Sequence, residues 1–371
     1  EAWVVRVAKN AVAADLVLKD AAGAAVVRVP AGRQIRGRTA TIPGIWGNEL
    51  FVEVDYDTAD SVNLFNLKVS EIRSEGGRLV TRRSETFRNL RMEDDFANSA
   101  IAVVNDGSKL IQLSREPEWP AGTTNRPACN GTLSGALPMA ATPPDTERRP
   151  VIPPDGANFD VDPGTGALAC TLRYDGAAPP RDYVELRPFL EAAIRAAGKE
   201  ELLQPARAAL TGATVRWQRI GDAEHYHILS GNGDDQASSR TLAFSGGAAA
   251  TLLLDTTPAV RLYQLGDTRL GGTQGDDGGL AEASELIGER GPKKGLYALE
   301  DVDLFNILCI PRAAALGEIE MRQVYSAAAT YCEERRAFLL VDVKPSGADL
   351  EGMQTWIQQN DSLRHRNAAV Y

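Results

Sequence analysis

The first candidate for chemistry is a pair of histidines near the middle of the chain. His225 and His227 are two residues apart in a segment typical of a β-strand, so both side chains would lie on one face, where imidazole nitrogens can bind a transition metal. No third histidine or cysteine is near them in the sequence, which leaves only an acidic residue as a further ligand. Two polar strand residues are the simpler interpretation, and we predict no metal site. His365, between two arginines, fits a surface contact.

Asp342 is the best catalytic candidate by position. It belongs to the apolar run 338–343, which is typical of a strand buried on both faces. In α/β folds, ligands bind at the carboxyl ends of such strands. No nucleophile or base near it in the sequence completes a catalytic set, so we expect a turn or helix-capping role. We predict no catalytic residue.

The glycine-rich run 271–279 is the remaining segment that could hold a ligand. It precedes a predicted strand, whereas a phosphate-binding loop follows a strand and opens a helix. Asp276 and Asp277 lack the spacing of a calcium loop. The sequence also lacks a P-loop, a dinucleotide-binding fingerprint and a nucleophile elbow. We therefore predict a flexible loop and no cofactor.

Composition narrows the remaining classes. The net charge of −10 disfavours a nucleic-acid-binding protein. No apolar run is long enough to span a membrane, and residues 1–7 do not resemble a signal peptide. Cys129, Cys170, Cys309 and Cys332 form no C-x-x-C pair, which disfavours a zinc or thioredoxin-type site. Reduced thiols and synthesis in the cytoplasm fit this pattern.

Residues 1–115 are predicted to be mostly β-structure. A hairpin is indicated where two strand-like runs, 62–72 and 78–84, flank Gly76-Gly77. Residues 94–104 are predicted to form a helix, with two aspartates favouring its N-terminal end. The other predicted strands are 2–7, 24–29, 50–55 and 108–113. The terminal strands 2–7 and 368–371 have no flanking turn or cap, which suggests a piece of a longer polypeptide.

Residues 116–262 are predicted to be an inserted, variable α+β module that faces outward. Prolines and glycines punctuate its first part, to residue 182. A helical stripe then covers 183–213, with a break at Gly198. The predicted strands are 168–172, 215–220, 225–229, 240–244 and 250–254.

The last hundred residues have the pattern of an α/β unit. Strand-like and helical segments alternate: strands at 302–310, 338–343 and 368–371, helices at 316–336 and 350–359. This alternation predicts βαβ crossovers and a parallel sheet.

Several motifs, in order, resemble the contractile phage tail sheath family, which includes the sheaths of extracellular contractile injection systems. Residues 44–48 (GIWGN), 85–90 (ETFRNL) and 103–110 (VVNDGSKL) are similar to its early patterns. The late ones are 275–278 (GDDG), 287–288 (IG), 295–303 (GLYALEDVD), 306–311 (NILCIP), 331–333 (YCE) and 367–371 (NAAVY). Residues 1–7 resemble the strand that ends the family's N-terminal segment. The likeness covers about 1–115 and 263–371.

The resemblance implies a multidomain α/β plus β protein. Its parts would be a three-layer α/β sheath core with parallel strands, a β-sandwich-like domain and the inserted α+β module. The corresponding domains are 1–40 and 263–371 for the core, 41–115 for the β-rich domain and 116–262 for the module. Both terminal arms and the C-terminal domain of the family would lie outside this sequence.

The implied function is structural. Such a subunit polymerises as stacked hexameric rings around an inner tube, and contraction drives the tube through a target envelope. Its partners would be neighbouring sheath subunits, reached through arms absent here, the tube protein, and baseplate and terminator or cap proteins. Nucleic acid and membrane binding by this fragment are not expected. The protein would be made in the bacterial cytoplasm and become part of a virion or injection particle. The alternatives are an α/β enzyme with a β-rich accessory domain and a surface-binding module.

Overall fold

The computed structural model describes residues 2–35, 38–76, 78–116, 126–141, 147–176, 178–231, 241–255, 260–344 and 349–370. The chain divides into two compact units. Unit 1 consists of the two ends of the chain, up to Val12 and from Asp277 onwards. Unit 2 is everything between, from Ala13 to Asp276.

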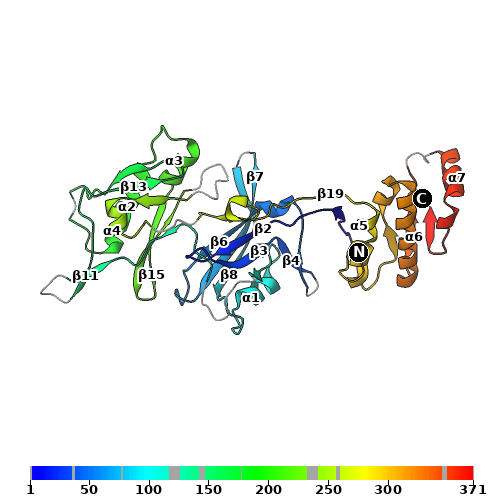
Figure 1. The fold of residues 1–371 in the computed structure, drawn as a ribbon, viewed down its shortest axis with the longest axis horizontal. Helices are drawn as coiled ribbons and strands as arrows, with labels where there is room; N and C mark the ends of the chain where they lie inside the picture. The colour runs from blue at the N-terminus through cyan, green and yellow to red at the C-terminus, as the bar shows by residue number, and fades with distance from the viewer. Residues whose placement is uncertain are drawn as a thin grey trace. The chain divides into compact units, whose positions relative to one another are not determined.

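The first core of unit 2 is β-rich. One antiparallel sheet has the order β2 (Asp15–Lys19), β3 (Ala25–Pro30), β9 (Ser114–Arg115). A second has the order β18 (Tyr263–Gln264), β6 (Leu50–Asp55), β7 (Phe65–Glu75), β8 (Arg78–Leu90). Beside them are the hairpin of β4 (Gly32–Ile35) and β5 (Arg38–Thr41), and the helix α1 (Ala100–Gly107) (Figure 1). Alternating apolar residues of both main sheets share one core, among them Leu16, Val29, Val52 and Leu67.

The observed strands test the hairpin, strand and domain predictions made for residues 1–115. The β7–β8 hairpin is confirmed, with Gly76 at a φ of 57° in its turn. The predicted strand 2–7 is wrong, because the first strand is the two-residue β1 (Ala8–Lys9). Residues 13–40 were predicted to belong to the same domain as 263–371. Instead, β2 and β3 pack their apolar faces into the β-rich core.

The predictions for 94–113 are also corrected. The helix begins only at Ala100, because the preceding backbone bonds to Arg91, the residue after β8: the Arg91 amide donates to the Asn98 carbonyl (3.0 Å) and the Ala100 amide to the Arg91 carbonyl (2.7 Å). Asp94 pairs with Arg115 instead of capping the helix. Residues 108–113 make one isolated bridge, at Ile111, and no strand.

The second core of unit 2 lies inside the predicted insertion. The helices α2 (Tyr183–Ala196), α3 (Gln204–Thr211) and α4 (Gly247–Thr251) gather with three small sheets (Figure 1). The sheets are β10 (Thr132–Leu133), β16 (Ala223–Leu229), β15 (Thr214–Ile220); β14 (Leu168–Thr171), β13 (Asn158–Asp162), β17 (Ala243–Ser245); and the pair β11 (Met139–Ala141), β12 (Arg148–Pro150). The expected helix break near Gly198 is confirmed. The predicted strand 250–254 is wrong, since α4 occupies its first part.

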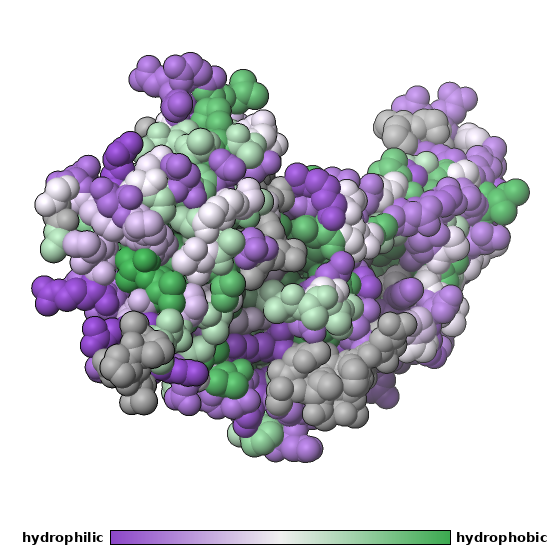
Figure 2. All heavy atoms as spheres, turned by 60° about the vertical axis from the view of Figure 1, so that its left-hand side comes forward, coloured by the Kyte–Doolittle hydropathy of each residue, from purple (hydrophilic) through white to green (hydrophobic). Residues whose placement is uncertain are grey.

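The surface of this module is mixed in polarity. Figure 2, in which the module comes forward, shows hydrophilic and hydrophobic residues interspersed over the visible face. Apolar residues contribute much of the surface of any folded protein, so scattered exposed ones need no special explanation.

Unit 1 contains the predicted parallel sheet. β20 (Ile307–Cys309), α6 (Glu318–Arg335), β21 (Phe338–Val341), α7 (Leu350–Gln359) and β22 (Ala368–Val370) follow one another, and the strands pair in parallel in the order β20-β21-β22. The predicted parallel pairing and both helices are confirmed. Before them come β19 (Gly279–Leu280), which pairs with β1, the helix α5 (Ala283–Ile287) and the 3₁₀ helix η3 (Gly295–Asp301). The three-layer and sandwich descriptions stay predictions.

Two of the sequence motifs meet in unit 2. The Asn48 side chain donates from Nδ2 to the Gly275 carbonyl (3.0 Å), and its Oδ1 accepts from the Gly275 amide (2.7 Å). Gly47 is equally constrained, because a Cβ there would lie 2.7 Å from Ala31 Cβ and 2.8 Å from Ala14 Cβ. The motif glycines and asparagine at 44–48 thus fix the position of the glycine loop at 272–276.

We predict that Gly47→Ala lowers the free energy of unfolding by about 1–3 kcal/mol, because the added methyl group overpacks the site. The matched control is Gly247→Ala in the first turn of α4, where the nearest atom to a new Cβ is 3.5 Å away. Urea denaturation checks both. Equal stability of the two variants would contradict the close packing at Gly47.

Candidate interaction groove

Unit 1 contains a groove beside β20, with a volume of about 780 Å³. We call it the β20 groove. Residues 308–312 line one side, and residues 5–8 and 277–281 line another. Apolar side chains dominate its lining: Val5, Leu280, Leu286, Leu296, Leu299 and Leu308. Its size suits a ligand or a short peptide segment.

The groove is lined in part by an edge strand of the parallel sheet. β20 is at the end of the order β20-β21-β22, so among the described strands only β21 pairs with it. An edge strand presents backbone amides and carbonyls to which another strand can bind. Parallel strands are normally well covered, which makes an edge beside an apolar hollow unusual.

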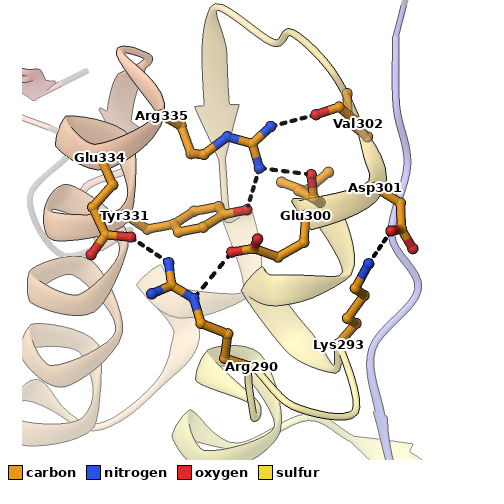
Figure 3. A network of polar contacts seen from close by, with 9 residues as sticks. Arg290, Lys293, Glu300, Asp301, Val302, Tyr331, Glu334 and Arg335 are labelled. Carbon is orange, nitrogen blue, oxygen red and sulfur yellow. Dashed lines mark hydrogen bonds and ion pairs between the residues drawn. The ribbon is translucent and has the colours of Figure 1, made fainter.

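A polar network holds the wall of the groove in place (Figure 3). Arg335, in the last turn of α6, donates from Nη1 to the Leu299 carbonyl (3.1 Å) and to the Tyr331 hydroxyl (3.0 Å), and from Nη2 to the Val302 carbonyl. The planar guanidinium can serve all three acceptors at once. These bonds fix the C-terminal end of η3, whose Leu296 and Leu299 side chains line the groove.

A second part of the network ties the segment before η3 to the end of η3 and to α6. Arg290 bridges Glu300 (3.1 Å) and Glu334, and Lys293 pairs with Asp301 (Figure 3). The Tyr331 ring packs edge-on against Tyr297, with ring centroids 5.5 Å apart. Burial raises the pKa of Tyr331, so its hydroxyl stays protonated. These contacts hold η3, which forms the wall of the groove, in a fixed position against α6.

The charged residues of the lining are paired. Arg6 contacts Asp277 (3.0 Å), and the Arg312 Nε donates to the Ala281 carbonyl (3.0 Å). Lys9 and Glu282 form a further ion pair near β19 (2.6 Å). The groove therefore offers an apolar floor, an edge strand, the Arg6–Asp277 ion pair and an arginine held by a backbone carbonyl. This arrangement suits binding an extended apolar segment better than it suits acid–base chemistry.

The two predicted strand histidines are structural. His225 Nδ1 lies 2.9 Å from the Ser134 carbonyl, and His227 Nε2 bonds to the Asn130 carbonyl. Both therefore hold the segment 130–134 against β16. In the part of the chain that the structure describes, no three histidine, cysteine or acidic side chains come together as metal ligands.

Asp342 and His365 lie in unit 1, outside the β20 groove. The Asp342 carbonyl accepts from the Tyr325 hydroxyl (3.1 Å), and its buried Oδ2 has no hydrogen-bond partner among the described residues. The expected turn or helix-capping role is wrong, because residue 342 is not in a turn and Asp349 caps α7 by accepting from the Gly352 amide (2.7 Å). His365 Nε2 lies 3.2 Å from Glu333.

The sequence interpretation missed the β20 groove. The motif 295–303 was noticed, but nothing in it distinguishes residues that line a hollow from residues that fill a core. Cys309 lies in an apolar run of the sequence and is nevertheless exposed, because side chains alternate in β20 between buried and exposed. The exposed apolar residues Trp3 and Leu280 are separated by most of the chain, and their segments are brought together by the β1–β19 pairing and by the Arg6–Asp277 and Lys9–Glu282 ion pairs.

No protein-family model matches the chain, and neither does any curated protein. Among the described residues, no helix combines the length and apolar character that crossing a bilayer requires.

We predict that replacing Arg335 with lysine lowers the stability of unit 1 by about 1–2 kcal/mol, because an ammonium group cannot reach the three acceptors together. Arg336→Lys, at the exposed next position, is the control. Thermal denaturation measures both. A loss no larger for Arg335 than for Arg336 would show that the network does not brace η3.

We also predict an acid-sensitive contribution from His227. Burial lowers its pKa below the ordinary value of 6.5, and the bond to Asn130 offsets this only in part. The unfolded chain then binds the proton first, so the free energy of unfolding falls as pH drops below about 6.5. His227→Gln should reduce this fall, measured as urea midpoints at about pH 7.5 and pH 5. An unchanged fall would contradict the assignment.

Proposed function

We propose that this chain belongs to a contractile tail sheath subunit that assembles with copies of itself around an inner tube. Motifs in family order support the proposal, and so does the contact between two of them at Asn48 and Gly275. The observation that carries it is the β20 groove. A sheath subunit needs a place where a neighbouring copy can hold on, and the groove has the form of such a place.

The groove suits a strand from another subunit. A segment entering it could pair its backbone with the edge of β20 while its side chains cover Leu280, Leu296 and Leu308. Backbone pairing supplies affinity that does not depend on sequence, and the apolar pocket supplies register. In the proposed lattice, the bound segment is an arm of a neighbouring sheath subunit. The braced η3 wall keeps the joint firm while the subunits change their arrangement.

The rest of the proposed setting follows from the resemblance. Besides its own copies, the subunit would contact the tube protein, the baseplate and the terminator or cap proteins. The particle would be a phage tail or an injection device assembled in the bacterial cytoplasm. Residues 116–262 would face outward, because a variable insertion is tolerated where it disturbs no lattice contact.

The test is assembly of the intact protein with a single charge placed in the groove. Leu280 is 74% exposed and pairs with Ala8 through its backbone alone, so Leu280→Asp should fold normally. A carboxylate there would be desolvated by an incoming strand, and we expect it to abolish tubes and stacked rings in negative-stain electron micrographs. The control is Leu203→Asp in the inserted module, where the side chain is 76% exposed.

Three outcomes are informative. Tubes from the wild type and Leu203→Asp but none from Leu280→Asp would support the proposal. Tubes from all three proteins would contradict the role of the groove. Soluble monomers of the wild type, with and without the tube protein, would contradict the sheath function itself.

A further inference from the structure

Unit 2 contains two hydrophobic cores that the chain connects twice. One core is formed by β2, β3, β6 and β7, and the other by the inserted module. The chain enters the module through residues 126–135 and is back at the β-rich core by β18. Inserted modules joined by linkers usually keep freedom of motion, unless a substantial interface holds them.

The two connections lie side by side and are bonded to each other. The Gly131 amide donates to the Val260 carbonyl (2.9 Å), and the Gly135 amide donates to the Leu253 carbonyl (2.8 Å). Gly131 has a φ of +76°, and a Cβ there would lie 2.4 Å from the Ile228 carbonyl oxygen. Only glycine lets the outgoing segment approach β16 so closely.

Asn130 is the centre of this junction and is 4% exposed. Its backbone amide donates to the Val54 carbonyl (3.0 Å), and its side-chain Oδ1 accepts from the Val54 backbone amide. Its Nδ2 donates to the Arg261 carbonyl (2.7 Å) on the returning segment. Its own carbonyl accepts from His227 in β16. One residue therefore bonds to β6, to the return of the chain and to the inserted module.

The residues just before Asn130 are also fixed to the β-rich core. The Tyr56 hydroxyl donates to the Pro127 carbonyl (2.8 Å), and the Arg126 guanidinium stacks over the Tyr56 ring, 3.4 Å from its centroid. The Ala128 amide donates to the Lys19 carbonyl (2.8 Å). The entry to the module is thus clamped on the side of the β-rich core.

We propose that Asn130 couples the β-rich core and the inserted module into one cooperative folding body, so that neither opens without the other. Its side-chain amide is fully used, and every group that it satisfies is backbone. Removing it would take away the hydrogen bond that the buried Val54 amide donates and one that the Arg261 carbonyl accepts, a cost that falls on the junction and on neither core alone. The proposal does not depend on the sheath function and can fail separately from it.

The experiment is native-state hydrogen exchange of the chain, read by mass spectrometry in β6–β7 and in α2. The perturbation is Asn66→Ala. Asn66 is 5% exposed and bonds only within the β-rich core, to Asp55, Asp57 and Asn89. In the wild-type background, cooperativity predicts that Asn66→Ala lowers protection in both segments by the same factor, about tenfold. In an Asn130→Ala background, it should lower protection in β6–β7 alone.

Two results would overturn the proposal. If Asn66→Ala spares α2 in the wild-type background, the two cores already open independently. If it still affects both segments equally in the Asn130→Ala background, another contact couples them. Asn130→Ser, which keeps one hydrogen-bonding group, replaces Asn130→Ala if that variant does not fold. It is then expected to weaken the shared response of the two segments, and an undiminished response would count against Asn130.

Discussion

The two hydrogen bonds between Asn48 and the Gly275 backbone join residues 227 positions apart. They hold the segment around Gly275, where the chain returns from the inserted module, against the segment around Asn48. A module can be inserted into another part of the chain only if the chain returns in this way. Closing a long loop costs conformational entropy that grows only slowly with its length, so a few well-placed bonds can offset it. The same design occurs at Asn130, where the chain enters the inserted module beside its return. At both places an asparagine side chain bonds backbone groups of distant segments, Gly275 in the case of Asn48 and Val54 and Arg261 in the case of Asn130, and glycines allow the segments to approach.

Because one part of the chain is inserted into another, the sequence could predict only the features that depend on local patterns. The β7–β8 hairpin, the helices α6 and α7 and the parallel pairing of β20, β21 and β22 depend on local patterns, and those predictions are confirmed. Predictions failed where distant backbone decides the structure. The backbone at Asn98 and Ala100 bonds to Arg91, just after β8, and so delays the helix, and residues 2–7 form no strand although they alternate. The grouping of β2 and β3 with β6 could not be predicted, because it follows from packing across the whole of unit 2.

The candidate site was still harder to predict. Its apolar lining comes from both ends of unit 1, and a hydrophobic residue in a sequence does not reveal whether it fills a core or lines a hollow. The candidates that sequence reasoning did find are mostly accounted for by structure. His225 and His227 bond backbone carbonyls, and the glycine run 271–279 packs against Asp15, Gly44 and Lys9. What distinguishes the β20 groove is an uncovered strand edge beside apolar residues, with a wall that Arg335 and Arg290 hold rigid.

In the proposed sheath, force passes between subunits at the β20 groove and through each subunit along its bonded junctions. The most direct test is a cryo-electron microscopy map of the assembled particle at side-chain resolution. The account predicts continuous extended density along β20, contributed by a neighbouring subunit and covering Leu280 and Leu308. A groove filled by the subunit's own chain, or left open to solvent in the assembly, would contradict it.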